Sequence, residues 1–243
     1  MGEGIRKYGV STKRVIRTVA GARRARRNFI DKPTRADRDI YGDKSIAERR
    51  ALQKQERAWS NEQSPIEKAR TYDTMGKEVF ANDHGTRHSV SIPWAARQNN
   101  TVTHIHPYKN NSLAGSIGIT LSSQDVANAV ATGEREVRAV ASGYTYSMRP
   151  QKGKGWGNHS AKAIKTYNSK AMSKWKKYYK DWYTKQESKA NKQYLEGKIT
   201  KAEYNKVSDR ITARWNVMVQ HKAMQDTAKH YGWVYTRAKT RKK

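Results

Sequence analysis

The pattern of apolar and polar positions changes along the chain, and the changes divide it into four segments. Residues 1–70 hold few apolar positions, whereas residues 71–150 show short strand-like alternation around one helical stretch. Residues 151–232 begin with a linker rich in glycine and lysine and continue with long helical periodicity, and residues 233–243 form a short apolar run with a basic tail. We therefore predict an α/β (α+β) fold in which a small mixed sheet receives a long inserted αα-hairpin.

Residues 71–150 are expected to supply most of the sheet. Strands are predicted at 77–82, 88–92, 102–106, 136–141 and 144–148. The first two flank an Asn-Asp-His-Gly turn, a combination that is typical of a β-hairpin. Ser122 and Asp125 stand at the two ends of a capping box, so a helix is predicted from there to Gly133.

Two long helices are predicted in the third segment. The first spans about 160–195, and the second opens with a Thr200-x-x-Glu203 capping box after Gly197. Aromatic side chains follow one face of the first helix, at Trp175, Tyr178, Tyr179, Trp182 and Tyr183. This face has two interpretations: it stacks on unpaired bases, or it packs against the second helix, which we prefer. Residues 233–235 are predicted as a strand that returns to the sheet, which makes the hairpin an insertion.

The first 70 residues are predicted to be a basic arm that becomes ordered on a partner, because they hold too few apolar side chains to bury a core. A single helix is favoured at Ser45–Trp59, with Ser45 as its N-cap and Glu48 three residues on. The basic cluster at Arg23–Arg27 is either a phosphate-contacting patch or a solvated tail.

Charge is distributed unevenly over these segments. The net charge is +29, yet residues 71–150 hold 7 basic and 6 acidic side chains, against 19 and 9 before them and 24 and 6 after them. Nucleic acid is the expected counter-charge, since Lys and Arg contacts with phosphates gain affinity by releasing condensed counterions. The candidate nucleic-acid-binding residues are Arg23, Arg24, Arg26, Arg27, Lys174, Lys176, Lys177 and Lys180. An anionic membrane surface and an acidic protein are less favoured alternatives.

The composition also excludes several classes of protein. The chain has no cysteine, which excludes disulfides and thiolate zinc sites. No apolar run approaches the ~20 residues of a membrane span, and the N-terminus lacks the apolar region of a secretion signal. We therefore expect a protein of the virion or of the host cytoplasm, not one secreted through a signal peptide.

The chemically most specific residues lie in the middle segment. His104 and His106 are two residues apart, so in a strand both imidazoles point to the same face. Asp125 on the next element would complete a set of two nitrogen ligands and one oxygen ligand, which leaves a fourth position open, as in catalytic zinc sites. The alternative is two polar histidines on a solvated face, with Asp125 serving only its capping box.

A family resemblance favours the metal site. His104-Ile105-His106-Pro107 together with Ser122-x-x-Asp125 resembles the signature of the JAMM (MPN, or JAB) metalloprotease fold. The runs 134–141 and 143–150, and the segment from His221 to Tyr235, resemble JAMM-like domains of phage minor head proteins and mobile-element toxins. The resemblance spans roughly residues 72–237, although the two short motifs alone are chemically specific.

The resemblance implies a JAMM-like core and a role for each residue of the site. His104, His106 and Asp125 would hold Zn²⁺, which lowers the pKa of bound water towards ~7 and polarises a substrate carbonyl. Glu78 would carry the proton of the attacking water, with Asp73 as its substitute, and Ser122 would donate a hydrogen bond to the oxyanion. The reaction implied is hydrolysis of a peptide or isopeptide bond.

The chain departs from the family pattern in two places, which keeps other functions open. The loop from Tyr108 to Leu121 is longer than usual and would suit a substrate-gating loop, and the upstream acid has no unambiguous counterpart. A non-catalytic virion or nucleoprotein component that binds DNA or RNA without sequence specificity, with other virion proteins as partners, is the main alternative. A metal-dependent nuclease is a weaker one.

Overall fold

The structure is a computed structural model that describes residues 40–42, 44–62, 64–107, 120–141 and 144–240. These residues all belong to one compact unit. The helices are α2 (Ile46–Glu62), α3 (Trp94–Arg97), α4 (Ser123–Thr132), α5 (Ala161–Tyr178), α6 (Lys180–Leu195) and α7 (Lys201–Tyr231). The strands are β1 (Lys68–Tyr72), β2 (Glu78–Asn82), β3 (Thr101–Ile105), β4 (Glu136–Ala141), β5 (Tyr144–Pro150) and β6 (Trp233–Lys239).

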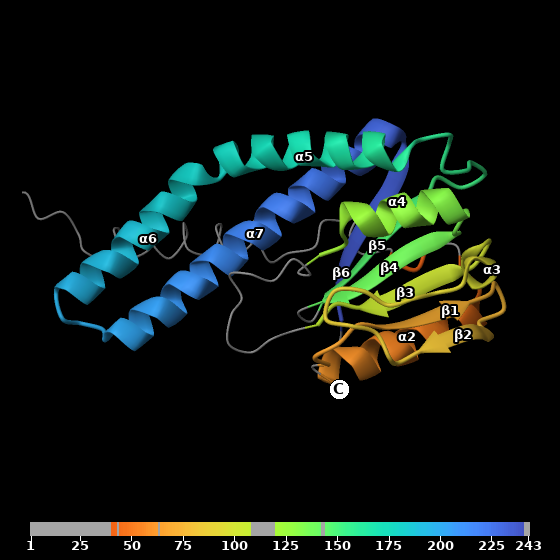
Figure 1. The fold of residues 1–243 in the computed structure, drawn as a ribbon, viewed down its shortest axis with the longest axis horizontal. Helices are drawn as coiled ribbons and strands as arrows, with labels where there is room; N and C mark the ends of the chain where they lie inside the picture. The colour runs from red at the N-terminus through yellow and green to blue at the C-terminus, as the bar shows by residue number, and fades with distance from the viewer. Residues whose placement is uncertain (1–39, 43, 63, 108–119, 142–143, 241–243) are drawn as a thin grey trace, which may run out of the picture. The chain divides into compact units, whose positions relative to one another are not determined.

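The strands form one mixed sheet in the order β2-β1-β3-β4-β5-β6 (Figure 1). Only the pairing of β3 with β4 is parallel among the described strands, and α4 lies in the connection between them. All the other pairings are antiparallel. The predicted α+β fold with a small mixed sheet is therefore confirmed.

Helices cover both faces of the sheet (Figure 1). On one face, α4, α5 and α7 pack on β4 to β6 around a core that includes Val126, Ala139 and Met224. On the other face, α2 lies against the sheet, with Trp59 in contact with Ile105 and Val140. Because successive strand residues point to opposite faces, β4 sends Val137, Ala139 and Ala141 into the apolar core, while Arg138 and Val140 face α2.

The layer under α2 is ionic. Arg138, which is fully buried, donates to Glu56 on α2 at 2.6 Å and also contacts Glu136. Burial alone would raise the pKa of Glu136, but Lys44 and Arg138 outweigh it and lower that pKa to about 2. Glu48, also on α2, accepts from Arg135 at 2.7 Å. Carboxylates that are buried this deeply are kept in proteins only when they are paired.

These contacts correct the boundary of the predicted arm. The predicted helix at Ser45–Trp59 exists as α2, with Ser45 Oγ accepting the backbone N–H of Glu48 at 3.1 Å, but it is part of the folded unit. The boundary at residue 70 falls inside β1, which pairs with both β2 and β3. The helix was assigned to the arm because it carries few apolar residues, whereas in the structure its buried face is charged. The cluster Arg23–Arg27 lies outside the described residues.

The predicted hairpin at residues 77–92 is also wrong. β2 pairs with β1 instead, and residues 88–92 form no strand. The turn between β1 and β2 is built by Asp73, whose Oδ1 accepts the backbone N–H groups of Met75 and Lys77 at 2.8 and 2.9 Å. Gly76 has a φ of +77° there, a conformation that glycine adopts without a steric penalty.

The helical insertion lies between β5 and β6, as predicted, and those two strands pair along their whole length. The first predicted helix is broken at Tyr179 into α5 and α6, and the Thr200–Glu203 capping box opens α7. The preferred interpretation of the aromatic face is confirmed for Trp175, whose Nε1 donates to Asp226 of α7 at 2.9 Å, and for Tyr183, whose ring lies 5.0 Å from that of Trp215. Tyr178, in contrast, is 65% exposed. Across the part of the chain that is described, none of the helices has the length and apolarity needed to cross a membrane.

Candidate metal centre

His104 and His106 stand at the end of β3 in the middle of the sheet. Each is 5% exposed, and β3 is buried along its whole length between β1 and β4. His106 follows the strand directly, and its backbone N–H donates to Val140 O at 2.9 Å, so the strand geometry continues through it. The two side chains therefore share one face of the sheet, as the i, i+2 spacing predicts.

Asp125 reaches the same point from the first turn of α4. The backbone N–H of Ser122 donates to Asp125 Oδ2 at 2.8 Å, and the backbone N–H of Asp125 donates to Ser122 Oγ at 3.1 Å. The capping box is therefore present, and it is compatible with the metal-binding interpretation. The box fixes the Asp125 carboxylate at the N-terminus of α4, and the two oxygens of that carboxylate face the imidazoles of His104 and His106.

The three side chains bring their ligand atoms together. His104 Nε2 lies 3.5 Å from Asp125 Oδ1, His106 Nε2 lies 3.6 Å from Asp125 Oδ2, and the two Nε2 atoms are 2.8 Å apart. One ligand atom from each of the three residues can be chosen so that all three atoms lie within 4.8 Å of one another. Tetrahedral zinc, bound at about 2.0–2.1 Å, keeps its ligand atoms roughly 3.3 Å apart, so the imidazoles need to separate by only about half an ångström. The donor set and its spacing fit zinc.

The electrostatics of the cluster favour a cation. Burial by itself would raise the pKa of Asp125, but the charges and hydrogen bonds of His104 and His106 outweigh it and hold that pKa well below its usual range. Asp125 therefore presents ionised carboxylate oxygens beside two imidazole nitrogens. A bound divalent ion would stabilise the same charge state, because it places positive charge against the carboxylate.

Glu78, the predicted proton carrier, does not lie at this centre. It pairs with Tyr72 of β1, which in turn pairs with Thr101 of β3, three residues before His104. That register places Glu78 roughly 10 Å along the strands from His104, and on the far side of β1. Its carboxylate instead lies 3.4 Å from Arg70 Nε and is 46% exposed. The expected position of Glu78 near the histidines is therefore wrong, and its substitute Asp73 builds the β1–β2 turn.

Glu67, which the sequence analysis did not single out, lies beside the histidines. In the antiparallel register of β1 and β3, Ala69 is opposite His104 and Lys68 is opposite Ile105. The next position places Glu67 opposite His106, and directly opposite residues project to the same face with Cβ atoms about 4.5–5.5 Å apart. The backbone N–H of Glu67 donates to Thr86 O at 2.7 Å, which fixes the residue at the end of β1.

The surroundings of Glu67 suit a group that exchanges protons. Burial raises the pKa of Glu67, Asp125 raises it further, and the two histidines partly offset the increase. A carboxyl group with a raised pKa both accepts and returns a proton more readily near neutral pH. The loop 83–92 packs tightly on this residue, since a Cβ at Gly85 would lie 2.3 Å from the backbone oxygen of Glu67.

Ser122 occupies the predicted position beside Asp125. It is half-buried, and its Oγ accepts the backbone N–H of Asp125, so its hydroxyl proton is available for donation to another group. The adjoining segment 108–119, which includes most of the predicted gating loop, lies outside the described residues.

The four predicted nucleic-acid-binding lysines lie away from this centre, on the helical insertion. Lys174, Lys176 and Lys177 are exposed on α5, and Lys180 is exposed at the start of α6. Lys174 is paired with Asp226 of α7 at 2.8 Å, which neutralises part of its charge. Arg23, Arg24, Arg26 and Arg27 lie outside the described residues.

Comparison of the chain with protein-family models, with curated proteins and with solved structures gave no match.

Proposed function

We propose that this chain is a zinc-dependent hydrolase of the JAMM type that cleaves a peptide or isopeptide bond. The observation that supports it most is the convergence of His104, His106 and Asp125 from β3 and α4 on one point, with the ligand atoms within 4.8 Å. The resemblance of the His-x-His-Pro and Ser-x-x-Asp motifs to the family supplies the reaction class. When bound there, zinc would polarise the substrate carbonyl and acidify a water molecule.

Residues of the chain itself would transfer the proton and stabilise the charge on the carbonyl oxygen. Glu67 accepts a proton from the water as its oxygen attacks the carbonyl carbon, and returns that proton to the amine when the C–N bond breaks. Ser122 donates a hydrogen bond to the carbonyl oxygen as negative charge develops on it. The burial of His104 and His106 keeps bulk water from their ring nitrogens, which strengthens every electrostatic interaction in the site.

Removal of the metal should abolish this activity. The protein, purified without chelators, should hydrolyse a fluorogenic peptide or isopeptide substrate, lose that activity after dialysis against a chelator, and regain it with one equivalent of Zn²⁺. The reason is that the three ligands hold the group that polarises the carbonyl. A labelled oligonucleotide serves as the control substrate. Cleavage of the oligonucleotide instead of the peptides would favour a metal-dependent nuclease, and cleavage of neither would favour a structural role.

A further inference from the structure

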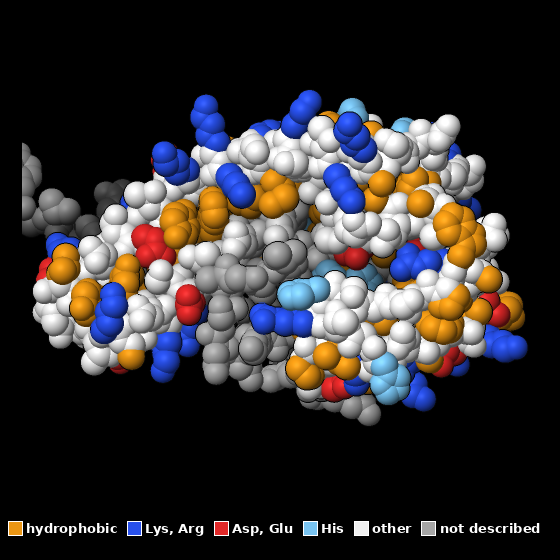
Figure 2. Space-filling model, viewed as in Figure 1, with side chains coloured by type: hydrophobic (Ala, Val, Ile, Leu, Met, Phe, Trp, Pro, Cys, Tyr) orange, Lys and Arg blue, Asp and Glu red, His pale blue; other side chains and the backbone are white. Residues whose placement is uncertain are grey.

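The helical insertion has a basic surface that the proposed hydrolase does not use. α5 carries six lysines and no acidic residue in its 18 positions. Figure 2 shows Lys and Arg side chains along the helical insertion, with hydrophobic side chains between them. Lys162 and Lys170 are exposed and, within the described part of the chain, form no ion pair. Unpaired ammonium groups on the exposed surface of a helix attract a polyanion.

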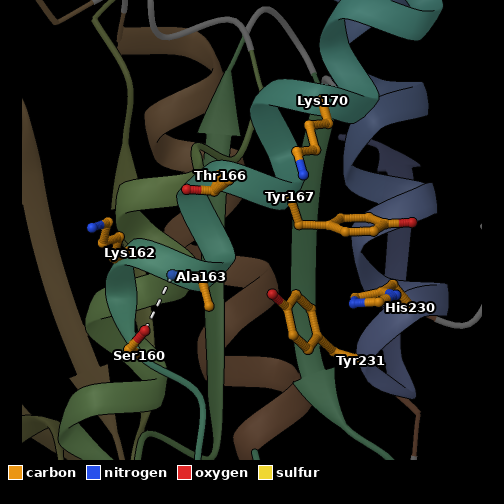
Figure 3. Close-up of a pocket in the computed structure, with 8 residues that line it drawn as sticks. All are labelled: Ser160, Lys162, Ala163, Thr166, Tyr167, Lys170, His230 and Tyr231. Carbon is orange, nitrogen blue, oxygen red and sulfur yellow. Dashed lines mark hydrogen bonds between the residues drawn. The ribbon is translucent and has the colours of Figure 1, made fainter.

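A groove of about 430 Å³ lies between these lysines and the end of α7. Its walls include Lys162, Thr166, Tyr167 and Lys170 from α5, and His230 and Tyr231 from α7 (Figure 3). Lys162 and Lys170 are eight residues apart, so the helical rise separates them by roughly 12 Å along one wall. The groove therefore combines two cations with aromatic rings, and its volume is in the range of sites that admit a small planar group.

The aromatic rings in the groove are already stacked. The rings of Tyr167 and His230 lie parallel, with centroids 3.9 Å apart and an interplanar angle of 9°. Tyr231 lies at 67° to Tyr167, so it forms a second wall at a steep angle to the stack. His230 is exposed, whereas Tyr167 is half-buried. An exposed ring whose orientation is held by a stacked neighbour is a platform on which a further planar ring can stack.

We propose that this groove binds single-stranded nucleic acid, with a base stacked on the Tyr167–His230 pair and the flanking phosphates on Lys162 and Lys170. Sequence-independent single-strand sites combine these two elements, a cationic track and aromatic platforms. A duplex keeps its bases inside, where the rings of the groove do not reach them. An acidic protein or an anionic membrane would use the lysines but not the stacked rings. The proposal is independent of the metal centre.

Binding of a fluorescein-labelled oligothymidylate of about 20 nucleotides, followed by fluorescence anisotropy with the full chain, tests the groove. The variant K162Q/K170Q should reduce the slope of log affinity against log salt by about 1.4, since each phosphate contact on a single strand contributes about 0.7. The control K185Q/K189Q removes the same charge from exposed positions on α6 and should leave the slope unchanged. The conservative variant K162R/K170R should retain wild-type binding.

Stacking has its own test. His230→Ala should weaken binding of the oligothymidylate by about 5- to 150-fold, the loss expected for one stacked base. It should leave the affinity for a duplex of equal length unchanged. His84→Ala, at an exposed position in the loop after β2, is the control. The proposal is overturned if His230→Ala binds the single strand like the wild type, if it weakens duplex binding equally, or if K185Q/K189Q lowers the slope as much as K162Q/K170Q. Circular dichroism checks that each variant is folded.

Discussion

Replacing Glu67 with glutamine should lower the rate of peptide or isopeptide hydrolysis by about 10²- to 10⁴-fold, the usual contribution of a positioned general acid–base group. Glutamine has nearly the same shape but neither accepts nor returns the proton. Because Glu67 is not among the three ligands, zinc content should stay at one ion per chain. The measurements are steady-state hydrolysis and metal analysis of the same preparation.

Glu78→Gln is the matched control, since Glu78 is a glutamate at the start of a neighbouring strand and its carboxylate pairs with Arg70. This variant should retain wild-type activity. If Glu78→Gln lost activity and Glu67→Gln kept it, the register between β1 and β3 would have to be different from the one described. Loss of zinc in Glu67→Gln would make Glu67 a ligand instead of a proton carrier.

Replacing Glu56 with alanine should lower the free energy of unfolding by about 3–5 kcal/mol, because it leaves the buried charge of Arg138 with only one of its two carboxylate partners. Arg138 is fully buried, and Glu56 accepts from its Nε at 2.6 Å and from its Nη2 at 3.1 Å. The hydroxyl of Tyr41 also donates to Glu56, at 3.0 Å. Urea denaturation followed by circular dichroism measures the change.

Glu62→Ala is the control for this prediction. Glu62 lies on the same helix and pairs with Lys68, but its side chain is 38% exposed. A surface pair of this kind contributes about 0–1 kcal/mol, so the variant should unfold at nearly the wild-type urea concentration. Equal destabilisation by the two substitutions would show that α2 is held by something other than the buried ionic layer.

The convergence of the three candidate metal ligands could be predicted because short-range rules determine their positions. Two histidines two residues apart in a strand must share a face, and a capping box fixes Asp125 within the first turn of α4. Neither rule depends on which strands pair. The convergence of β3 and α4 then requires only that the helix after the strand packs on the same face, which is how a strand–helix–strand unit folds.

The acidic residue beside the histidines was not identified from the sequence because its position depends on long-range strand pairing. The sequence of β1 is Lys-Ala-Arg-Thr-Tyr. Because of its two basic residues the segment does not resemble a buried strand, although β1 pairs with β2 on one side and with β3 on the other. The turn signal that would have revealed it is Asp73-Thr-Met-Gly76, where Asp73 caps its own turn and Gly76 takes a positive φ. Recognition of that turn makes residues 68–82 the hairpin and places Glu67, not Glu78, at the histidine end.

The extent of the N-terminal arm was overestimated for a related reason. Sequence patterns identify a core by its apolar residues, whereas α2 packs on the sheet through Glu48 and Glu56. On an isolated helix such carboxylates indicate a solvated face. Their partners are Arg138 of β4 and Arg135, which directly precedes that strand. Both lie more than 80 residues later, and no local pattern in the sequence connects them to α2.

Metal analysis of the full chain, purified without chelators, tests the central claim most directly. The wild type should contain one zinc ion per chain, or take up one on titration, because His104, His106 and Asp125 present three ligand atoms in a space that fits the ion. The double variant H104A/H106A should bind none while keeping the circular dichroism spectrum of the wild type. A folded wild-type protein that contains no metal and binds none on titration would contradict the account.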